Sequence, residues 1–224
     1  MISTNTKSKT GIGDLNMTQI DWAGHPPFGR QVSLKHTLEL MHELRGKRLP
    51  LIVELGTAET YSPDGLGNAL MAFSWYAGKY GARIKTVDIR EGAVRNAREI
   101  LKQYVPEYAD IPEITNADAF EWVTTLHEPI DLLYVDAGFE LVGEFNYRAF
   151  VKRHPEIPSF YVELHNQFDP GCFHSGSLML IDDTDPNTYD GKGIFLIPYL
   201  LGRGWRKVDL RGVPVFPMVL LEKA

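Results

Sequence analysis

Short apolar segments alternate with amphipathic segments along most of the chain. Five segments of strand length are rich in apolar or β-branched residues, namely 51–55, 83–89, 113–117, 130–136 and 177–183. The first of them, LIVEL, is almost continuously apolar and is broken by Gly56. Runs of this kind are typical of parallel strands that are buried on both faces of a sheet.

Apolar residues recur at helical spacing between these strands. One helix is predicted to have Ser33 as its N-cap, followed by an apolar face formed by Leu34, Leu38, Met41 and Leu44. Further helices are predicted at residues 66–77, 93–104, 119–126 and 193–202. Because strand and helix alternate, we expect an α/β fold of the Rossmann-like, doubly wound type with a mostly parallel, seven-stranded sheet.

The last two predicted strands break this alternation. Residues 205–210 and 215–223 are separated by the four residues RGVP. A connection this short joins antiparallel neighbours, whereas parallel neighbours need a long crossover. We therefore expect a C-terminal antiparallel hairpin, whose apolar surface could serve as the interface of a homo-oligomer.

The length and the charge of the chain narrow the function classes. The 224 residues suit one sizeable domain, and Asp and Glu outnumber Lys and Arg by 29 to 23. This balance does not favour a nucleic-acid partner. Cys172 is the one cysteine, so no intramolecular disulfide can form, and no apolar stretch has the length of a membrane span. We expect a cytoplasmic protein that acts on a small molecule.

An acidic residue stands at or just after the end of each of the five parallel strands. These acids are Glu54, Asp88, Asp118, Asp136 and the pair Asp182–Asp183. Ligands of open α/β sheets bind at the carboxyl ends of the strands, so we expect the acids to meet at one edge, in the binding site. Such an edge suits hydroxyls, amines, a positive centre or a divalent cation better than a pyrophosphate.

These strand ends also resemble a known family. The segments VELGTAETYS, TVDIR, NADAFEW, LLYVDAGFE and LMLIDDTD occur in this order and are similar to class I S-adenosylmethionine (AdoMet)-dependent methyltransferases. The nearest branch is the small-molecule O-methyltransferases, including the catechol-type and macrolide-sugar-type enzymes. The resemblance covers about residues 30–224 and implies methyl transfer from AdoMet to a hydroxyl group of a small molecule.

The resemblance also implies roles for individual residues. The loop after the first strand, which passes the methionine part of the cofactor, would use Glu54, Gly56, Thr57, Ala58 and Ser62. The ribose and the adenine would be bound by Asp88, Ile89, Asp118 and Ala119, with Asp136 also beside the cofactor. In the metal-dependent branch Mg²⁺ or another divalent cation would be held by Asp136, Asp182 and Asp183, three oxygen donors of the kind that such ions prefer.

Some positions depart from the family pattern. Ala58 and Thr60 stand where glycines are usual, and Phe139 stands where relatives often carry a His or Lys base. No catalytic residue is therefore assigned, although His165 and His174 are candidates for the base. A zinc site made of these histidines and Cys172 matches no strong spacing motif.

Two other functions stay open from the sequence. A nicotinamide dinucleotide oxidoreductase would need G-x-G-x-x-G, which GTAETY does not supply. A catalytically inactive protein with the AdoMet fold would explain the altered loop. The composition of the first residues predicts a mobile N-terminal arm at residues 1–30, and the resemblance implies one methyltransferase-like domain at residues 31–224. Residues 140–177 would form a lid or acceptor-binding insertion in that domain.

Overall fold

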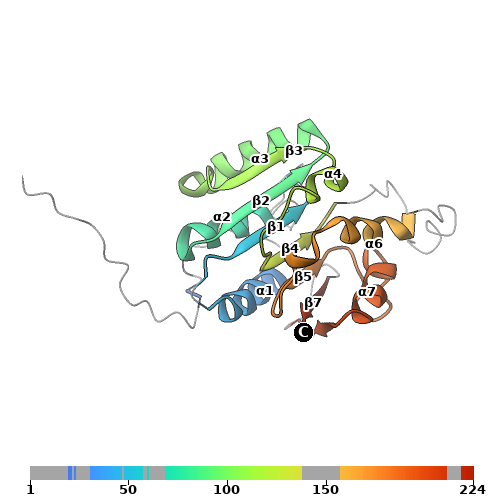
Figure 1. Ribbon diagram of the computed structural model, residues 1–224. Coiled ribbons are helices and arrows are strands. Elements are labelled where there is room, and N and C mark those ends of the chain that lie inside the picture. Colours follow the sequence, from blue (N-terminus) through green and yellow to red (C-terminus); the bar gives the residue numbers. More distant parts are fainter. Residues whose placement is uncertain are drawn as a thin grey trace, which may run out of the picture.

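The computed structural model describes residues 20, 21, 23, 31–46, 48–57, 60, 69–137, 157–210 and 218–224. Its strands form one sheet in the order β3-β2-β1-β4-β5-β7-β6 (Figure 1). The bounds are β1 Leu51–Leu55, β2 Arg83–Asp88, β3 Pro112–Asn116, β4 Leu132–Val135, β5 Leu178–Ile181, β6 Trp205–Val208 and β7 Val219–Lys223.

The direction of the strands confirms the predicted fold class. β1 to β5 run parallel to one another, whereas β7 is antiparallel to both β5 and β6. The predicted C-terminal hairpin is therefore present. It extends the sheet beyond β5.

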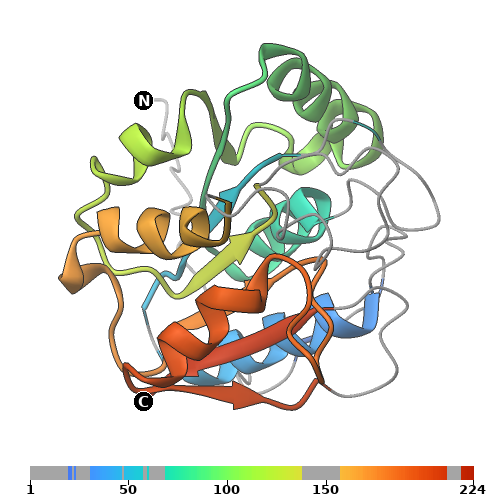
Figure 2. The same ribbon diagram turned by 90° about the vertical axis from the view of Figure 1, so that its right-hand side faces the viewer.

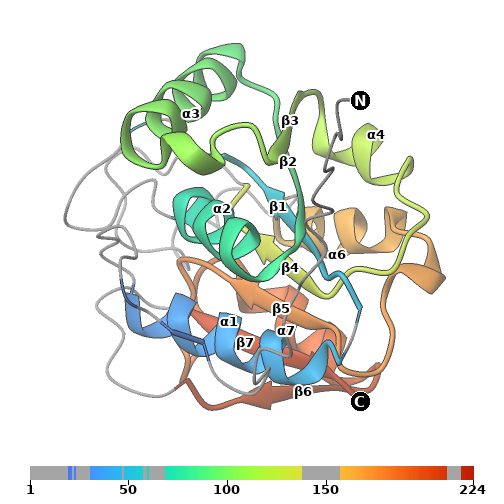
Figure 3. The ribbon, with the colours of Figure 1, turned by 90° about the vertical axis from the view of Figure 1, so that its left-hand side faces the viewer.

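The helices cover the two faces of the sheet in separate layers, as Figure 3 shows with the strands running from β3 to β6. One layer holds α1 Gln31–Leu44, α2 Ala69–Tyr80 and α3 Glu91–Tyr104. The other holds α4 Ala119–Val123, α6 Ile157–Gln167 and α7 Gly193–Leu201. Two 3₁₀ turns, η1 Pro106–Tyr108 and η2 Pro170–Cys172, lie in the connections.

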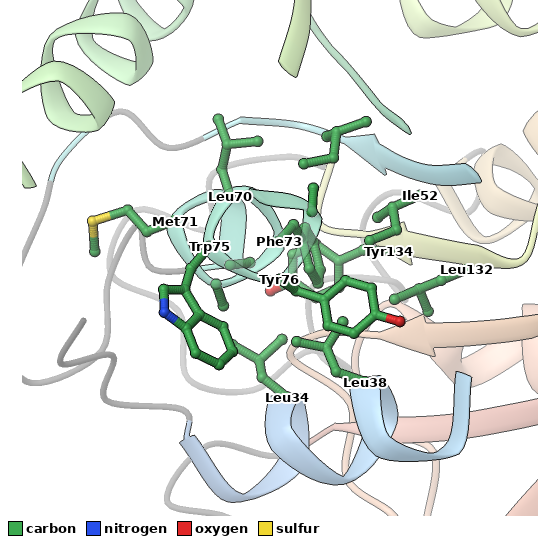
Figure 4. Close-up of a cluster of buried hydrophobic side chains, with 14 of the residues drawn as sticks. Leu34, Leu38, Ile52, Leu70, Met71, Phe73, Trp75, Tyr76, Leu132 and Tyr134 are labelled. Atoms are coloured by element: carbon green, nitrogen blue, oxygen red, sulfur yellow. The ribbon is translucent and has the colours of Figure 1, made fainter. Parts of the chain in front are cut away.

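Alternation along each strand divides the core between these two layers. In β1, Ile52 packs in the cluster on the α1–α3 side, whereas Leu51 and Val53 pack in the cluster on the other side. Figure 4 shows the first cluster. In it, the Phe73 ring of α2 packs edge-on against the Tyr134 ring of β4, with the ring centroids 5.7 Å apart. Because each large apolar side chain contributes about 2 kcal/mol when fully buried, this packing holds the helices on the sheet.

The start of α1 differs from the prediction. Ser33 is not an N-cap, because α1 begins by Gln31 and Ser33 lies inside its first turn. Its side chain is buried, and its carbonyl oxygen accepts a bond from the Thr37 hydroxyl at 2.8 Å. Leu44 also departs from the predicted apolar face, since it is 43% exposed at the end of the helix.

Two parts of the predicted organisation fall mostly outside the described residues. Of the arm, Ile20 is buried in the α1–α3 cluster and Asp21 is hydrogen-bonded to Tyr80, while residues 1–19, 22 and 24–30 are not described. Of the insertion, residues 140–156 are not described, so the arm and the lid stay predictions. α6 contributes buried Tyr161 and Leu164 to the core. None of the described helices has both the length and the apolar character needed to cross a membrane.

Candidate functional site

The carboxyl ends of β2, β1, β4 and β5 lie side by side at one edge of the sheet. In the register of the strands, Leu55 of β1 pairs with Val87 of β2 and Val135 of β4, and Val135 pairs with Ile181 of β5. Acids stand beside or just after these residues, so the predicted acidic edge is formed. Figure 2 views the molecule from the side on which these strands end.

The turn after β1 requires glycine. Gly56 has φ +83°, and a Cβ added there would lie 2.6 Å from the backbone nitrogen of Ala137, which follows β4. The Gly56 N–H donates to the Val87 carbonyl at 2.8 Å, which ties the turn to β2. The next residue, Thr57, is buried and its N–H donates to Asp88 Oδ2 at 3.1 Å. Ala58 and Ser62 lie outside the described residues.

Glu54 is buried at the centre of the edge. The residue is 2% exposed, and Oε2 of its carboxyl group accepts a bond from the Thr86 hydroxyl of β2 at 2.7 Å. Burial, together with the negative charges of Asp136 and Asp88, raises the pKa of Glu54 to about 8. The side chain is thus mostly protonated at neutral pH, and a cationic ligand at this edge would favour its ionised form.

Asp88 at the end of β2 is bound by four donors of its own chain. Oδ1 accepts from the backbone N–H of Arg90 at 2.8 Å and from its Nε at 3.2 Å. Oδ2 accepts from the N–H of Thr57 and from Nη2 of Arg90 at 3.2 Å. Four bonds fill the acceptor positions of a carboxylate, so a ribose diol could bind only by displacing the Arg90 guanidinium.

The residues predicted at the adenine are open to solvent. Asp118 is the N-cap of α4, where Oδ1 accepts from the Phe120 N–H at 2.7 Å, and its side chain is exposed. Ala119 is the first residue of α4. Ile89 is 67% exposed next to Asp88, and so offers an apolar surface beside the ribose acid. The Asn116 amide donates to the carbonyls of Asp88 and Ile89 and so fixes this turn.

Asp136, Asp182 and Asp183, the acidic triad, come together at the ends of β4 and β5. Each offers one oxygen, and these oxygens lie within 4.8 Å of one another. Asp182 is fully buried, where Oδ2 accepts from the Tyr134 hydroxyl at 2.6 Å and Oδ1 accepts from the Asp183 N–H at 2.8 Å. The sequence therefore predicted the grouping correctly.

A lysine that the sequence analysis did not single out lies within the triad. Lys192 Nζ is 2.6 Å from Asp136 Oδ1, 2.9 Å from the Asp136 carbonyl oxygen and 3.1 Å from Asp183 Oδ2. Burial by itself would lower the pKa of Lys192, but the two carboxylates outweigh it and raise the pKa above its ordinary value. The side chain stays an ammonium ion, so the triad as arranged does not fit a divalent cation.

The loop from β5 to α7 places this lysine. Gly191 has φ +118°, and a Cβ there would lie 1.7 Å from the Asp183 carbonyl oxygen, so the loop can return this close to β5 only at glycine. Thr184 pairs with Gly191 in an isolated antiparallel bridge, and its hydroxyl accepts from the Gly193 N–H at 3.0 Å. Lys192 thus lies at the start of α7, facing back toward Asp183.

The candidate bases and the suggested zinc ligands do not join this edge. His174 Nε2 lies 3.5 Å from Asp131, which precedes β4 at the opposite edge. His165 is stacked on Phe173 with ring centroids 5.3 Å apart, and burial lowers its pKa to about 4. Cys172 is buried and its thiol donates to the Leu126 carbonyl. His165 and Cys172 therefore pack in the interior, and His174 makes polar contacts away from the acidic edge.

Comparisons with known proteins bear on the fold. No protein-family model matches the chain, and no curated protein matches it in sequence. Solved structures do match. A provisionally assigned caffeoyl-CoA O-methyltransferase from Staphylococcus aureus is 14% identical, with a TM-score of 0.58. The match covers 89% of this chain and 86% of the Staphylococcus chain. The chain therefore has the class I methyltransferase fold.

Two further structures show how widely this fold is shared. A provisionally assigned rRNA methylase from Clostridium thermocellum is 12% identical with a TM-score of 0.52, covering 86% of this chain and 97% of its own. The methyltransferase PaMTH1 from Podospora anserina, solved with S-adenosylhomocysteine (SAH) bound, is 16% identical with a TM-score of 0.51, covering 83% and 76%. Identities this low establish the fold alone.

Proposed function

We propose that the protein is an AdoMet-dependent methyltransferase that acts on a hydroxyl group of a small molecule. The observation that carries the proposal is the Gly56 turn, which leads from β1 past buried Glu54 to the Asp88 carboxylate at the end of β2. This arrangement lies at the carboxyl edge of a sheet of methyltransferase topology, where ligands of such sheets bind.

The described residues fit the parts of AdoMet. Asp88 is placed to accept bonds from two ribose hydroxyls once the Arg90 side chain, which is 43% exposed, moves aside. Ile89 offers apolar surface to the adenine, and the exposed Asp118 can accept from its amine. Glu54 faces the position expected for the methionine part, where a positive charge would stabilise its ionised form.

The chemistry follows from this placement. Bound AdoMet supplies an electrophilic methyl group on a sulfonium. The protein would hold the acceptor oxygen in line with that methyl group, so that the new oxygen–carbon bond forms as the carbon–sulfur bond breaks, SAH leaves and the hydroxyl proton is released to solvent. Holding the two reactants in this geometry contributes much of the rate. The acidic balance of the whole chain supports a small-molecule acceptor over a polyanion.

Calorimetric titration tests the cofactor part of the proposal. The protein should bind AdoMet and SAH, and Asp88→Ala should weaken binding about 100-fold, because two charge-assisted bonds to the ribose are lost. Asp110→Ala removes an exposed aspartate before β3 and is the matched control, with unchanged affinity. Binding of NADH with no response to AdoMet would favour the oxidoreductase alternative and refute the proposal.

Release of SAH tests the transfer. Incubation of the protein and AdoMet with a phenol, a sugar, a carboxylic acid or an RNA should yield SAH with a hydroxyl compound. Turnover with RNA alone would overturn the small-molecule acceptor. AdoMet binding without turnover on any acceptor would support the inactive alternative.

A further inference from the structure

We propose that Lys192 is the resident cation of the acidic triad, in place of a divalent metal ion, and that it positions Asp136 and Asp183 at the acceptor side of the site. Its effect on methyl transfer rests on the proposed function. The assignment of the cation itself depends only on the geometry of the triad.

The ammonium group lies between the carboxylates that would ligate a metal ion. It reaches oxygens of Asp136, at the end of β4, and of Asp183, after β5, at 2.6 and 3.1 Å. Its third bond, at 2.9 Å, goes to the carbonyl oxygen of Asp136. Side-chain and carbonyl oxygens of this kind are also the ligands of Mg²⁺ or Mn²⁺, so the lysine satisfies the same donor set.

Lys192 is fixed in place by its hydrogen bonds and its backbone, and is not a loosely associated counter-ion. An ammonium group has three donors, and all three are used in these bonds. The residue is 9% exposed. Its backbone is fixed by the Gly191 turn against Asp183 and by the Thr184 cap of α7. The third acid, Asp182, has both oxygens engaged by Tyr134 and by the Asp183 N–H.

It follows that methyl transfer by this chain would not require an added metal ion. Because its three donors are occupied, Lys192 does not itself donate to the acceptor. It acts as a positioning residue that neutralises the triad and joins the ends of β4 and β5. A metal-dependent relative would instead bind the acceptor oxygens on the ion. This chain is expected to transfer the methyl group equally well in the presence of a chelator.

Binding of Mn²⁺ alone, followed by electron paramagnetic resonance of the free ion, tests the assignment. The wild-type protein should show no Mn²⁺ site at the triad, whereas Lys192→Met should gain one that binds at least about tenfold more tightly than any wild-type binding. Lys192→Gln provides a second, more polar variant if the first folds poorly. Lys102→Met, which removes an exposed lysine of α3, is the matched control and should gain no site.

The double variant Lys192→Met/Asp136→Asn identifies the location, since it should lose the Mn²⁺ site that Lys192→Met gained. Tight Mn²⁺ binding by the wild type that Asp136→Asn removes would overturn the proposal. So would folded Lys192 variants that gain no site. Because AdoMet binding is measured separately, failure of the cofactor titration would refute the proposed function without deciding the identity of the cation.

Discussion

The two ends of the acidic edge compensate their negative charge in different ways. At the end of β2, Asp88 is paired with Arg90, whose side chain is 43% exposed. At the ends of β4 and β5, Asp136 and Asp183 are paired with Lys192, whose side chain is 10% exposed. Asp88 itself is buried, but the guanidinium of Arg90 is open to water, so a ligand can displace it more easily than the buried ammonium group of Lys192, whose three donors are all used.

This difference assigns separate tasks to the two ends. Under the proposed function, a ribose diol would replace the guanidinium of Arg90 on Asp88 at the β2 end. A divalent cation would have to expel Lys192 from three hydrogen bonds. Between the two ends, Glu54 has a hydroxyl partner and a raised pKa in place of a basic partner. Protonation is thus the third way in which this edge limits its charge.

The largest expected effect concerns Glu54 and pH. Its folded pKa of about 8 lies above the ordinary value of 4.5, so the folded protein keeps a proton that the unfolded chain releases. The contribution of Glu54 to the free energy of unfolding is therefore complete below pH 4.5 and is lost as pH rises to about 8, by up to about 1.4 kcal/mol per pH unit.

Urea denaturation across this pH range measures that loss. Glu54→Gln should remove this part of the pH dependence, whereas Glu113→Gln, at an exposed position of β3, should leave it in place. If the free energy of unfolding of the wild type and of Glu54→Gln changed with pH in the same way, Glu54 would not have the raised pKa of a buried acid without a basic partner.

The next largest effect is expected at Gly56, which joins the two ends. Gly56→Ala forces a Cβ against the Ala137 backbone at a positive φ and should lower the free energy of unfolding by about 3 kcal/mol. Gly176→Ala has a similar φ of +86° but open space around its Cβ, so it should cost only about 1 kcal/mol. Equal losses in thermal or chemical denaturation would show that the contact with Ala137 is unimportant.

Lys192→Met should lower the free energy of unfolding by about 2 kcal/mol. Loss of one partner of a fully buried pair costs more, but Asp136 and Asp183 are 38% and 57% exposed and regain water. Chemical denaturation at neutral pH measures the change. An effect no larger than that of Arg90→Ala would remove the distinction between the two ends.

The smallest effect is expected for Arg90→Ala. Stability should change by less than about 1 kcal/mol, and AdoMet affinity should rise by up to about fivefold, because the ribose no longer competes with the guanidinium. Arg206→Ala breaks a comparable exposed pair with Glu222 and should leave affinity unchanged. Weaker AdoMet binding by Arg90→Ala in calorimetry would mean that the guanidinium contacts the ligand instead.

The sequence was sufficient to predict the strands and the acidic edge because both depend on local pattern. LIVEL, LLYV and LMLI are buried on both faces, and the acids follow from the rule that parallel strands end at one edge. The short final connection likewise required an antiparallel hairpin. The predicted start of α1 was wrong because a serine inside the first turn of a helix and a serine N-cap look alike in sequence.

The partners of the acids could not be predicted in the same way. Arg90 stands in TVDIR, two residues after Asp88, but its return to that carboxylate depends on the turn that leads into α3. Lys192 is nine positions from Asp183 and meets it because Gly191 lets the chain pass close to the Asp183 carbonyl oxygen. The sequence does show a lysine next to a glycine in the loop after β5. Its contact with the acidic edge, however, depends on the path of that loop, which the sequence alone does not reveal.

A crystal structure of the protein grown with SAH and Mn²⁺, with anomalous data at the manganese edge, tests the account most directly. We predict SAH at the ends of β1 and β2, with its ribose on Asp88 and Arg90 turned away. At the triad we predict Lys192 bound to Asp136 and Asp183 and no manganese peak. A manganese peak among Asp136, Asp182 and Asp183 with Lys192 displaced, or SAH bound elsewhere, would contradict it.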